Sequence, residues 1–290
     1  MNIASRFRAL MQQEQLIVAP GAYDGMTARL IEAAGFPAVY MTGAGTAATF
    51  GYPDYGLLTM SEMVENAGRI SAAVSLPVIA DADTGYGNEL NVVRTVREYE
   101  RMGVAGIHIE DQGFPKRCGH LDDKEIIPLD AYLAKIRAAT EARRNPDFMI
   151  IARTDSGAVA GFEEAIRRAN AALSAGADMA FVEAPRTMDE LAAVPKRVKG
   201  PCLLNLVRLG KSPDIDFAIA REMGYRLAIV PGLLFTCAVG ACEAALTELK
   251  QTGRHPVLPK DLPLKETFRR FGADEWDVVR SRYKALKAAE

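Results

Sequence analysis

Eight short apolar runs recur along the chain, and a helical pattern follows each one; no other feature constrains the fold as strongly. The runs are rich in aliphatic and β-branched residues, and they span residues 16–20, 38–43, 77–83, 106–111, 148–154, 179–184, 202–207 and 227–232. The helical patterns span residues 24–34, 61–74, 89–102, 130–144, 161–175, 187–198, 213–223 and 233–251. Apolar strands that alternate with helices are typical of a parallel sheet covered by helices. Eight such units in 290 residues predict a closed (β/α)8 barrel, the TIM barrel.

A doubly wound open sheet is the main alternative to the barrel. That fold usually carries a glycine-rich phosphate-binding turn after its first strand. Here the first run leads into PGAYDG at residues 20–25, which contains neither a GxGxxG motif nor a P-loop. The barrel is therefore favoured, as an α/β domain over residues 1–252 that begins with a helix. We expect residues 253–290 to form a C-terminal extension that ends in an amphipathic helix for oligomer packing.

The charge balance argues against nucleic acid and membranes as partners. Lys and Arg total 35 against 37 Asp and Glu, which gives a formal net charge of −2 and no excess of basic side chains for polyanions. The longest uncharged stretch, residues 227–242, is too short to span a membrane, and the first residues lack the apolar core of a signal peptide. The four cysteines form no CxxC pair. We expect a cytoplasmic protein that acts on a small molecule.

Acidic residues gather where the expected strands end. Asp81 and Asp83 close the third run, and Glu110 lies at the end of the fourth. Asp81 and Asp83 are two residues apart, so in a strand both side chains point the same way. Carboxylate oxygens suit Mg²⁺ or Mn²⁺, and the sequence therefore predicts a divalent-cation site here. The alternative is that Asp83 caps the following turn while Asp81 alone faces the site.

Two loops are expected to cover this end of the barrel. The motif KRCGH at residues 116–120 lies in a loop over residues 112–122 whose glycines and length suit a mobile lid. Its thiol, Cys118, has basic neighbours, so we expect it to favour the thiolate or to exchange protons easily. The alternative is a solvated loop with an inert cysteine. The second loop, residues 50–56, is rich in aromatic side chains, and its Asp54 either reaches the water shell of the metal or caps a turn.

Three motifs give the chain a family resemblance. They are YMTGAG at residues 40–45, DADTGYG at residues 81–87 and KRCGH at residues 116–120. With these motifs the chain resembles the isocitrate lyase and phosphoenolpyruvate mutase superfamily over essentially its whole length. KRCGH is the most specific of the three, because the phosphonomutase branch usually lacks its cysteine, and it indicates the carbon–carbon lyase branch. The resemblance implies a C-terminal helix swapped between the subunits of a homodimer or homotetramer.

The resemblance also implies roles for individual residues. The three acidic residues above would hold Mg²⁺, with Glu110 acting through water. Cys118 would be the general acid, and Arg153 would neutralise the developing oxyanion in a retro-aldol-like cleavage of a 2-hydroxy dicarboxylate. The general base is open between Tyr40, Glu110 and a metal-bound hydroxide. Besides Arg153, the implied substrate-binding residues are Thr42, Gly43, Ala44, Asp54, Lys116, Gly119, His120, Glu183, Asn205 and Arg208.

Two departures from the family pattern narrow the expected substrate. Isocitrate and methylisocitrate lyases typically carry a phenylalanine–arginine pair that holds an extra carboxylate, and here that pair is Phe235–Thr236. The family normally has an acidic residue three positions after the asparagine of the seventh strand, here Asn205, and this chain has Arg208 at that position. We therefore expect an alkyl-substituted malate, such as 2,3-dimethylmalate, to be cleaved into a 2-keto acid such as pyruvate and a carboxylic acid. Arg208 could supply the missing charge, which keeps 2-methylisocitrate open as the alternative.

Other functions of the same scaffold remain as alternatives. They are oxaloacetate decarboxylation and chemistry like that of carboxyphosphonoenolpyruvate phosphonomutase. Decarboxylation does not need a thiol acid, so KRCGH argues against it. A non-catalytic binding barrel would show gaps in the acidic residues or in the lid, and the sequence shows none.

Overall fold

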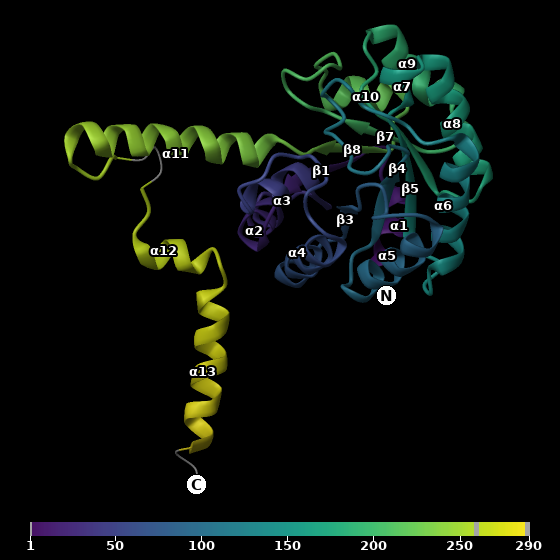
Figure 1. Ribbon diagram of the computed structural model, residues 1–290. Coiled ribbons are helices and arrows are strands. Elements are labelled where there is room, and N and C mark those ends of the chain that lie inside the picture. Colours follow the sequence, from purple (N-terminus) through teal and green to yellow (C-terminus); the bar gives the residue numbers. More distant parts are fainter. Residues whose placement is uncertain (1, 258–260, 288–290) are drawn as a thin grey trace. The chain divides into compact units, whose positions relative to one another are not determined.

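The computed structural model describes residues 2–257 and 261–287 of the chain. Within these residues, eight parallel strands pair in sequence order, and β1 closes the sheet by pairing with β8. The strands are β1 (Ile17–Ala22), β2 (Val39–Met41), β3 (Val78–Asp81), β4 (Gly106–Glu110), β5 (Met149–Thr154), β6 (Met179–Val182), β7 (Cys202–Asn205) and β8 (Leu227–Val230). The predicted (β/α)8 barrel is confirmed (Figure 1).

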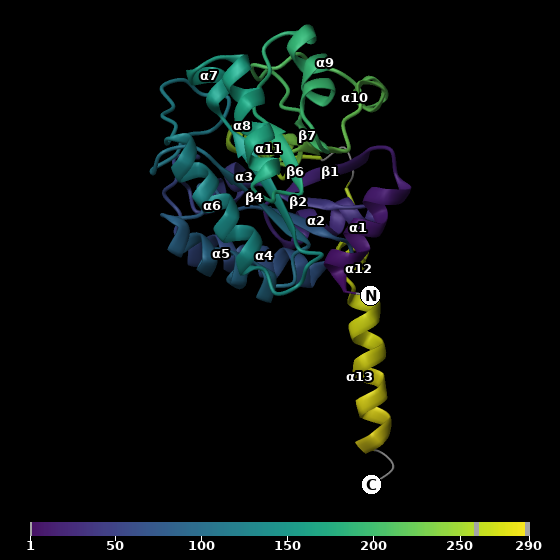
Figure 2. The same cartoon turned by 90° about the vertical axis from the view of Figure 1, so that its right-hand side faces the viewer.

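Helices surround the strands of the barrel (Figure 2). They are α1 (Ile3–Gln13), α2 (Gly25–Ala33), α3 (Gly43–Thr49), α4 (Met60–Ala73), α5 (Glu89–Arg101), α6 (Leu129–Ala142), α7 (Ser156–Val159), α8 (Phe162–Ser174), α9 (Met188–Arg197) and α10 (Phe217–Met223). After β8 the chain continues with α11 (Leu233–Thr252), α12 (Leu264–Arg269) and α13 (Ala273–Lys287). In the described part of the chain, no helix combines the length and the apolar content needed to cross a membrane.

Two short helices, α3 and α7, directly follow β2 and β5, and the sequence pattern does not predict them. In the case of α3, the Thr42 hydroxyl accepts the N–H of Gly45 at 3.3 Å and caps the helix. A side-chain cap satisfies one of the backbone donors that the first helical turn leaves unpaired. Because of this cap, the second strand ends at Met41, and the glycine-rich turn after it is the first turn of a helix.

The core lies in two layers, one inside the barrel and one between the strands and the helices. Inside, fully buried side chains such as Ile79 and Phe181 fill the barrel axis. Outside, strand residues such as Val78 and Ile107 pack against helical residues such as Val96. The interior is therefore a packed core rather than a channel, and a binding site can form only at one end of the barrel.

Helix α1 covers the N-terminal ends of the strands. Its Phe7 is fully buried against the barrel interior, and its Arg8 pairs with Asp178 at 2.8 Å. A hollow of about 550 Å³ remains at this end, but the guanidinium of Arg226 on its wall donates to the carbonyls of Met11 and Glu14. The charged groups at this end therefore serve the fold, and the reactive side chains gather at the opposite end.

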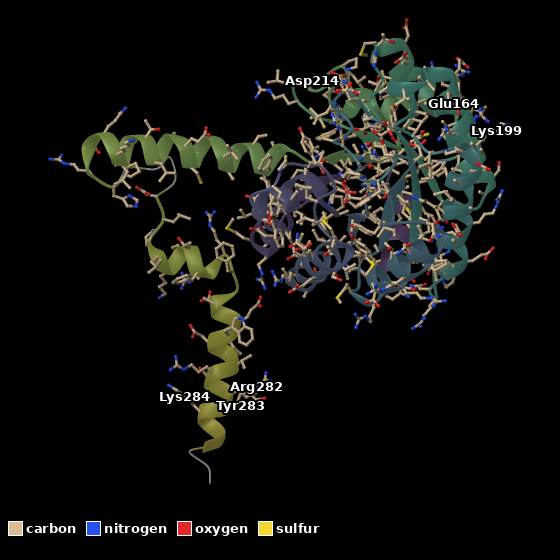
Figure 3. The ribbon with its side chains drawn as sticks, in the orientation of Figure 1. Glu164, Lys199, Asp214, Arg282, Tyr283 and Lys284 are labelled. Atoms are coloured by element: carbon tan, nitrogen blue, oxygen red, sulfur yellow. The ribbon has the colours of Figure 1, made fainter. Side chains whose placement is uncertain are left out.

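The chain divides after Phe235 into two compact units, Met1–Phe235 and Thr236–Glu290. The second unit contains most of α11 together with α12 and α13, and its Trp276 is 70% exposed. Figure 3 shows the side chains of Arg282, Tyr283 and Lys284 on α13. The domain boundary expected after residue 252 stays a prediction, but the contacts in this structure group residues 236–252 with the C-terminal helices.

Candidate active site

A small cavity of about 110 Å³ lies where the carboxyl ends of the strands meet. Its lining includes most of the side chains that the sequence singles out, namely Tyr40, Thr42, Ala44, Asp54, Asp81, Cys118, Gly119, His120, Arg153, Glu183 and Asn205. The other lining residues, which the sequence analysis does not assign to the site, are Gly45, Val207, Pro231, Gly232 and Phe235. Catalytic groups of this fold come from the same end of the barrel, so the cavity is the candidate active site.

Asp81, the last residue of β3, lines the cavity with an ionised carboxylate. Its Oδ1 accepts the N–H of Asp83 at 2.9 Å, and its Oδ2 lies 3.4 Å from the Tyr40 hydroxyl. Burial would raise the pKa of Asp81, but nearby basic side chains, His108 first among them, outweigh burial and lower it to about 2. Asp81 is therefore negatively charged at neutral pH and can bind a cation.

The beginning of α3 lies directly against Asp81. A Cβ atom on Gly43 would lie 2.4 Å from Asp81 Oδ2, so any larger residue would have to displace the Asp81 side chain. The backbone N–H groups in the first turn of a helix have no partners within the helix and attract anions. The turn formed by Thr42, Gly43 and Ala44 can therefore bind a substrate carboxylate beside the Asp81 side chain.

Tyr40 and His108 form a neutral pair beneath this turn. The Tyr40 hydroxyl lies 2.8 Å from His108 Nε2, and the two rings stack with their centroids 5.8 Å apart. Burial lowers the pKa of His108 to about 4 and raises the pKa of Tyr40 well above its ordinary value. Both side chains are therefore uncharged at neutral pH, and this favours Tyr40 as a hydrogen-bond donor over Tyr40 as a base.

Lys116 of the lid reaches across the site to two aspartates. Its Nζ lies 2.5 Å from Asp54 Oδ1 and 2.9 Å from Asp83 Oδ1, and its side chain is 2% exposed. Strand β3 ends at Asp81, and Asp83 has a φ of 46°. The expectation that Asp81 and Asp83 share one face of an extended strand is therefore wrong, because the backbone turns before Asp83.

Glu110 is the buried carboxylate with the strongest need for a further partner. It is fully buried, and neither of its carboxylate oxygens has a hydrogen-bond partner among the described residues. Burial raises its pKa well above the ordinary value, against the charge of Arg153 3.2 Å away. In the described part of the chain, no three acidic, imidazole or thiol groups are placed to ligate one ion directly. The carboxylates of Asp81 and Glu110 are hard oxygen donors, which suit a hard cation such as Mg²⁺ that keeps several water ligands.

Arg153 of β5 is held between acidic groups. Its Nε lies 2.9 Å from Asp155 Oδ2 and 3.2 Å from Glu110 Oε2, and Nη2 lies 3.8 Å from Glu183 Oε1. Burial would lower the pKa of Arg153, but these acids, with Asp155 first, raise it well above the ordinary value. A guanidinium fixed in this way keeps its charge and its orientation, so it can stabilise negative charge that develops in the cavity.

The lid places Cys118 against the cavity. The Cys118 N–H donates to the Asp54 carbonyl at 3.1 Å, and the residue is half-buried. Burial, reinforced by the carboxylates of Asp54 and Glu183, raises the pKa of the thiol to about 11. The expectation that basic neighbours favour the thiolate is therefore wrong, because Arg117 is exposed and Lys116 is already paired with acids. A thiol that stays protonated at neutral pH suits a proton donor.

Glu183, Asn205 and His120 line the opposite wall. Asn205 Nδ2 lies 3.2 Å from both carboxylate oxygens of Glu183, and His120 Nε2 lies 3.3 Å from one of them. The lid packs tightly here, since a Cβ on Gly119 would lie 2.2 Å from Glu183 Oε1. Arg208, by contrast, is exposed and does not line the cavity. Its role as a substrate ligand stays a prediction.

The sequence analysis misses Lys124, which lies two residues beyond the lid. Its side chain is 1% exposed, and its ammonium group contacts Asp155 Oδ1 at 2.8 Å and the Gly119 carbonyl at 2.5 Å. In the sequence, Lys124 lies in the charged run LDDKE at residues 121–125, which has the composition of a solvated loop. Only the fold brings it to Asp155, so the sequence holds no indication of this contact.

The chain is similar to known proteins over most of its length. The family model described as phosphoenolpyruvate phosphomutase matches residues 7–250. The 2,3-dimethylmalate lyase of Eubacterium barkeri is 47% identical over 251 residues, which cover 86% of this chain and 87% of that protein. The 2-methylisocitrate lyase of Aeropyrum pernix is 44% identical over 246 residues, which cover 85% of this chain and 79% of that protein.

Solved structures of related enzymes also resemble this chain. A crystal structure of 2,3-dimethylmalate lyase superposes with a TM-score of 0.93 and 44% sequence identity, and it covers 98% of this chain and 96% of that one. A phosphonopyruvate hydrolase in complex with oxalate and Mg²⁺ superposes with a TM-score of 0.87 and 33% identity, with coverage of 98% and 99%. The similarity to these chains therefore extends beyond the barrel to nearly the full length.

Proposed function

The chain belongs to the phosphoenolpyruvate phosphomutase family, and from that premise we propose that it is a carbon–carbon lyase. Its substrate is a 2-hydroxy dicarboxylate, which it cleaves into a 2-keto acid such as pyruvate and a carboxylic acid. The observation that carries the proposal is a protonated Cys118 that the lid holds against the same cavity as Asp81 and Arg153. Cleavage of a carbon–carbon bond leaves a carbanion, and this thiol is a proton donor in reach of it.

The preferred substrate is an alkyl-substituted malate such as 2,3-dimethylmalate. Among the described residues that line the cavity, Arg153 is the one guanidinium, and it already pairs with Asp155. A third carboxylate would therefore enter without a cation to meet it, at a large desolvation cost. The wall formed by Val207, Pro231 and Phe235 suits an alkyl group instead. The 2-methylisocitrate alternative is supported by the Aeropyrum pernix relative and would need Arg208 to move inward.

The residues present fit a bound Mg²⁺, or Mn²⁺ in its place. Asp81 would ligate the ion, and Asp83 and Glu110 would hold its water ligands. The fit is supported by the carboxylate donor set and by the buried Glu110, whose carboxylate oxygens have no hydrogen-bond partner among the described residues beside the ion pair with Arg153. When bound, the ion supplies Lewis-acid polarisation of the substrate hydroxyl and of the keto oxygen that forms from it.

Backbone and side-chain groups of the protein bind the substrate, stabilise the oxyanion and transfer the protons. The first turn of α3 binds the carboxylate next to the reacting carbon, and Arg153 stabilises the oxyanion when the hydroxyl loses its proton. The bond between C2 and C3 then breaks, the hydroxyl oxygen becomes the keto oxygen, and the electron pair stays on C3. Cys118 Sγ–H gives its proton to C3, and the thiolate recovers a proton from solvent. Glu110, in its ionised form, is the side-chain candidate that accepts the hydroxyl proton, because the neutral Tyr40 serves as a hydrogen-bond donor.

We also propose a cytoplasmic homodimer or homotetramer that exchanges its C-terminal helices. The support is the set of large exposed apolar side chains on α13, which include Trp276, Val278 and Tyr283. Exposed apolar surface of this kind usually marks a protein interface. Removal of the residues after 255 should therefore give insoluble protein or monomers in size-exclusion chromatography with light scattering. A truncated protein of the native oligomeric size would contradict the exchange.

A substrate panel tests the proposed reaction directly. The purified protein with Mg²⁺ should release pyruvate and propionate from 2,3-dimethylmalate faster than pyruvate and succinate from 2-methylisocitrate. A chelator should stop the release, and excess Mg²⁺ should restore it. Carbon dioxide from oxaloacetate as the fastest reaction would favour the decarboxylase alternative. Phosphorus-31 spectra with phosphonate substrates test the phosphonomutase alternative. No turnover of any of these acids would favour a binding barrel.

A further inference from the structure

The ring of His120 is held by a backbone group from another loop. Its Nδ1 accepts the N–H of Lys211, which lies in the segment between β7 and α10, at 2.9 Å. An imidazole nitrogen that accepts a hydrogen bond carries no proton, so the neutral ring carries its proton on Nε2. Burial lowers the pKa of His120, so the neutral ring dominates at neutral pH and its tautomer decides what it can bind.

The other nitrogen of the ring, Nε2, belongs to the wall of the active site. His120 lines the cavity and its side chain is 9% exposed. Nε2 lies 3.3 Å from Glu183 Oε1, yet it has no hydrogen-bond partner among the described residues. A buried donor without a partner is costly. The N–H is therefore available to a substrate oxygen that enters the cavity.

Gly210 is shaped to accommodate this ring. A Cβ on Gly210 would lie 2.6 Å from His120 Nδ1, 2.9 Å from Cε1 and 2.9 Å from the Val207 carbonyl oxygen, so a larger residue must shift the imidazole or the loop that contacts it. The next residue, Lys211, also contacts the lid through its side chain, with Nζ 3.2 Å from the Leu121 carbonyl and a further contact to Asp122. The segment thus contacts the lid at His120 and at the two residues that follow it.

We propose that Gly210 and Lys211 are positioning residues that fix His120 as an Nε2–H donor to a carboxylate of the substrate. The inference rests on the proposed lyase function, which supplies the carboxylate. If the proton were on Nδ1, Nε2 would present a lone pair to Glu183 and to an anionic substrate, and both would repel it. The backbone N–H of Lys211 excludes that arrangement without adding a charge to the cavity.

Nitrogen-15 spectra of histidine-labelled protein test the tautomer without any substrate. The chain has only three histidines, so replacement of His255 by Gln and of His120 by Gln assigns the signals. The native protein should show an unprotonated Nδ1 and a protonated Nε2 for His120. A protonated Nδ1 would overturn the proposal, whether or not the protein cleaves any of the proposed substrates.

The Gly210→Ala variant tests the role in binding. It should shift the His120 signals and raise KM about tenfold or more, as expected when a hydrogen bond to a charged group is lost, while kcat stays within about threefold. Gly240→Ala is the matched control, because a Cβ at Gly240 meets nothing within 4 Å. If Gly210→Ala does not fold, the tautomer measurement on the native protein still tests whether His120 carries its proton on Nε2. Unchanged His120 signals and an unchanged KM in a folded Gly210→Ala variant would overturn the proposal.

Discussion

The strand ends and the lid supply the two halves of the active site, and they are built in different ways. At the strand ends, backbone pairing sets the positions: Glu110 is the register partner of Arg153, and Asp81 is the partner of His108. The lid, residues 112–122, has no strand or helix of its own, and side-chain contacts such as that of Lys116 with Asp54 hold it in place.

This difference makes the strand ends the rigid half of the site and the lid the more mobile half. Neighbouring strands of a closed barrel share hydrogen bonds along their length, so a strand-end residue moves only if the barrel deforms. The lid depends on a few buried ion pairs and hydrogen bonds, and each of them can be broken singly. The strand ends therefore hold charged side chains in fixed positions. The lid holds the proton donor Cys118 in a position that depends on a few side-chain contacts.

The largest effect should come from the proton donor of the lid. Cys118→Ser should lower kcat by on the order of 10²- to 10⁴-fold, because a serine hydroxyl is a far weaker acid than a thiol. KM should change little, because the strand ends still bind the substrate. Pyruvate release measured with a coupled dehydrogenase checks both values. Cys237→Ser, which replaces an exposed cysteine of α11, is the control and should behave as the native protein.

The next effect should come from Lys124, which joins the two halves. Lys124→Met removes a buried ammonium and leaves Asp155 with Arg153 alone, so the free energy of unfolding should fall by on the order of 3–5 kcal/mol. Urea unfolding followed by circular dichroism measures the change. The exposed Lys199 provides a control, since Lys199→Met should shift stability by less than about 0.5 kcal/mol. Equal stability of the two variants would mean that Lys124 does not link the halves.

A smaller effect should come from the rigid half. Gly43→Ala adds a methyl group 2.4 Å from Asp81 Oδ2, and the strain should cost about 1–3 kcal/mol because the buried Asp81 side chain must shift to make room. Since the strain falls on the carboxylate-binding turn, it should raise KM for the dicarboxylate about tenfold while Cys118 chemistry continues. Steady-state kinetics checks this expectation. A native KM in a folded variant would mean that the turn is not the carboxylate site.

The smallest effect should come from Arg208. The residue is exposed and lies outside the cavity lining, so Arg208→Ala should change kcat/KM for 2,3-dimethylmalate by less than about twofold. A selective loss of activity toward 2-methylisocitrate would instead show that Arg208 reaches the third carboxylate of that substrate. Parallel kinetics with the two acids separates these outcomes.

The strand-end half is the half that the sequence predicts well. Eight repeated units imply a closed barrel, and the ends of parallel strands must meet, so Asp81, Glu110, Arg153, Glu183 and Asn205 could be placed near one another before the fold was known. These predictions need only the order of strands along the chain. They do not need the distance between any two side chains.

The sequence predicts that the lid covers the site, but not the charge state and the ion pairs of the lid, for physical reasons. The pKa of Cys118 depends on burial and on the carboxylates of Asp54, from another loop, and Glu183, from the end of β6, and no motif around residue 118 encodes them. The pairing of Lys124 with Asp155 joins residues that are 31 apart in sequence. The alternation rule also fails at Asp83, because it assumes an extended strand and β3 ends two residues earlier.

Titration of the Cys118 thiol tests the central claim most directly, namely that the lid presents a protonated acid to the cavity. The rate of alkylation by iodoacetamide can be followed against pH by mass spectrometry of the peptide that contains residue 118. Burial near Asp54 and Glu183 predicts slow alkylation at neutral pH and a midpoint at a pH of about 11. A midpoint at or below that of a free thiol, about 8.5, would show a reactive thiolate and contradict the claim.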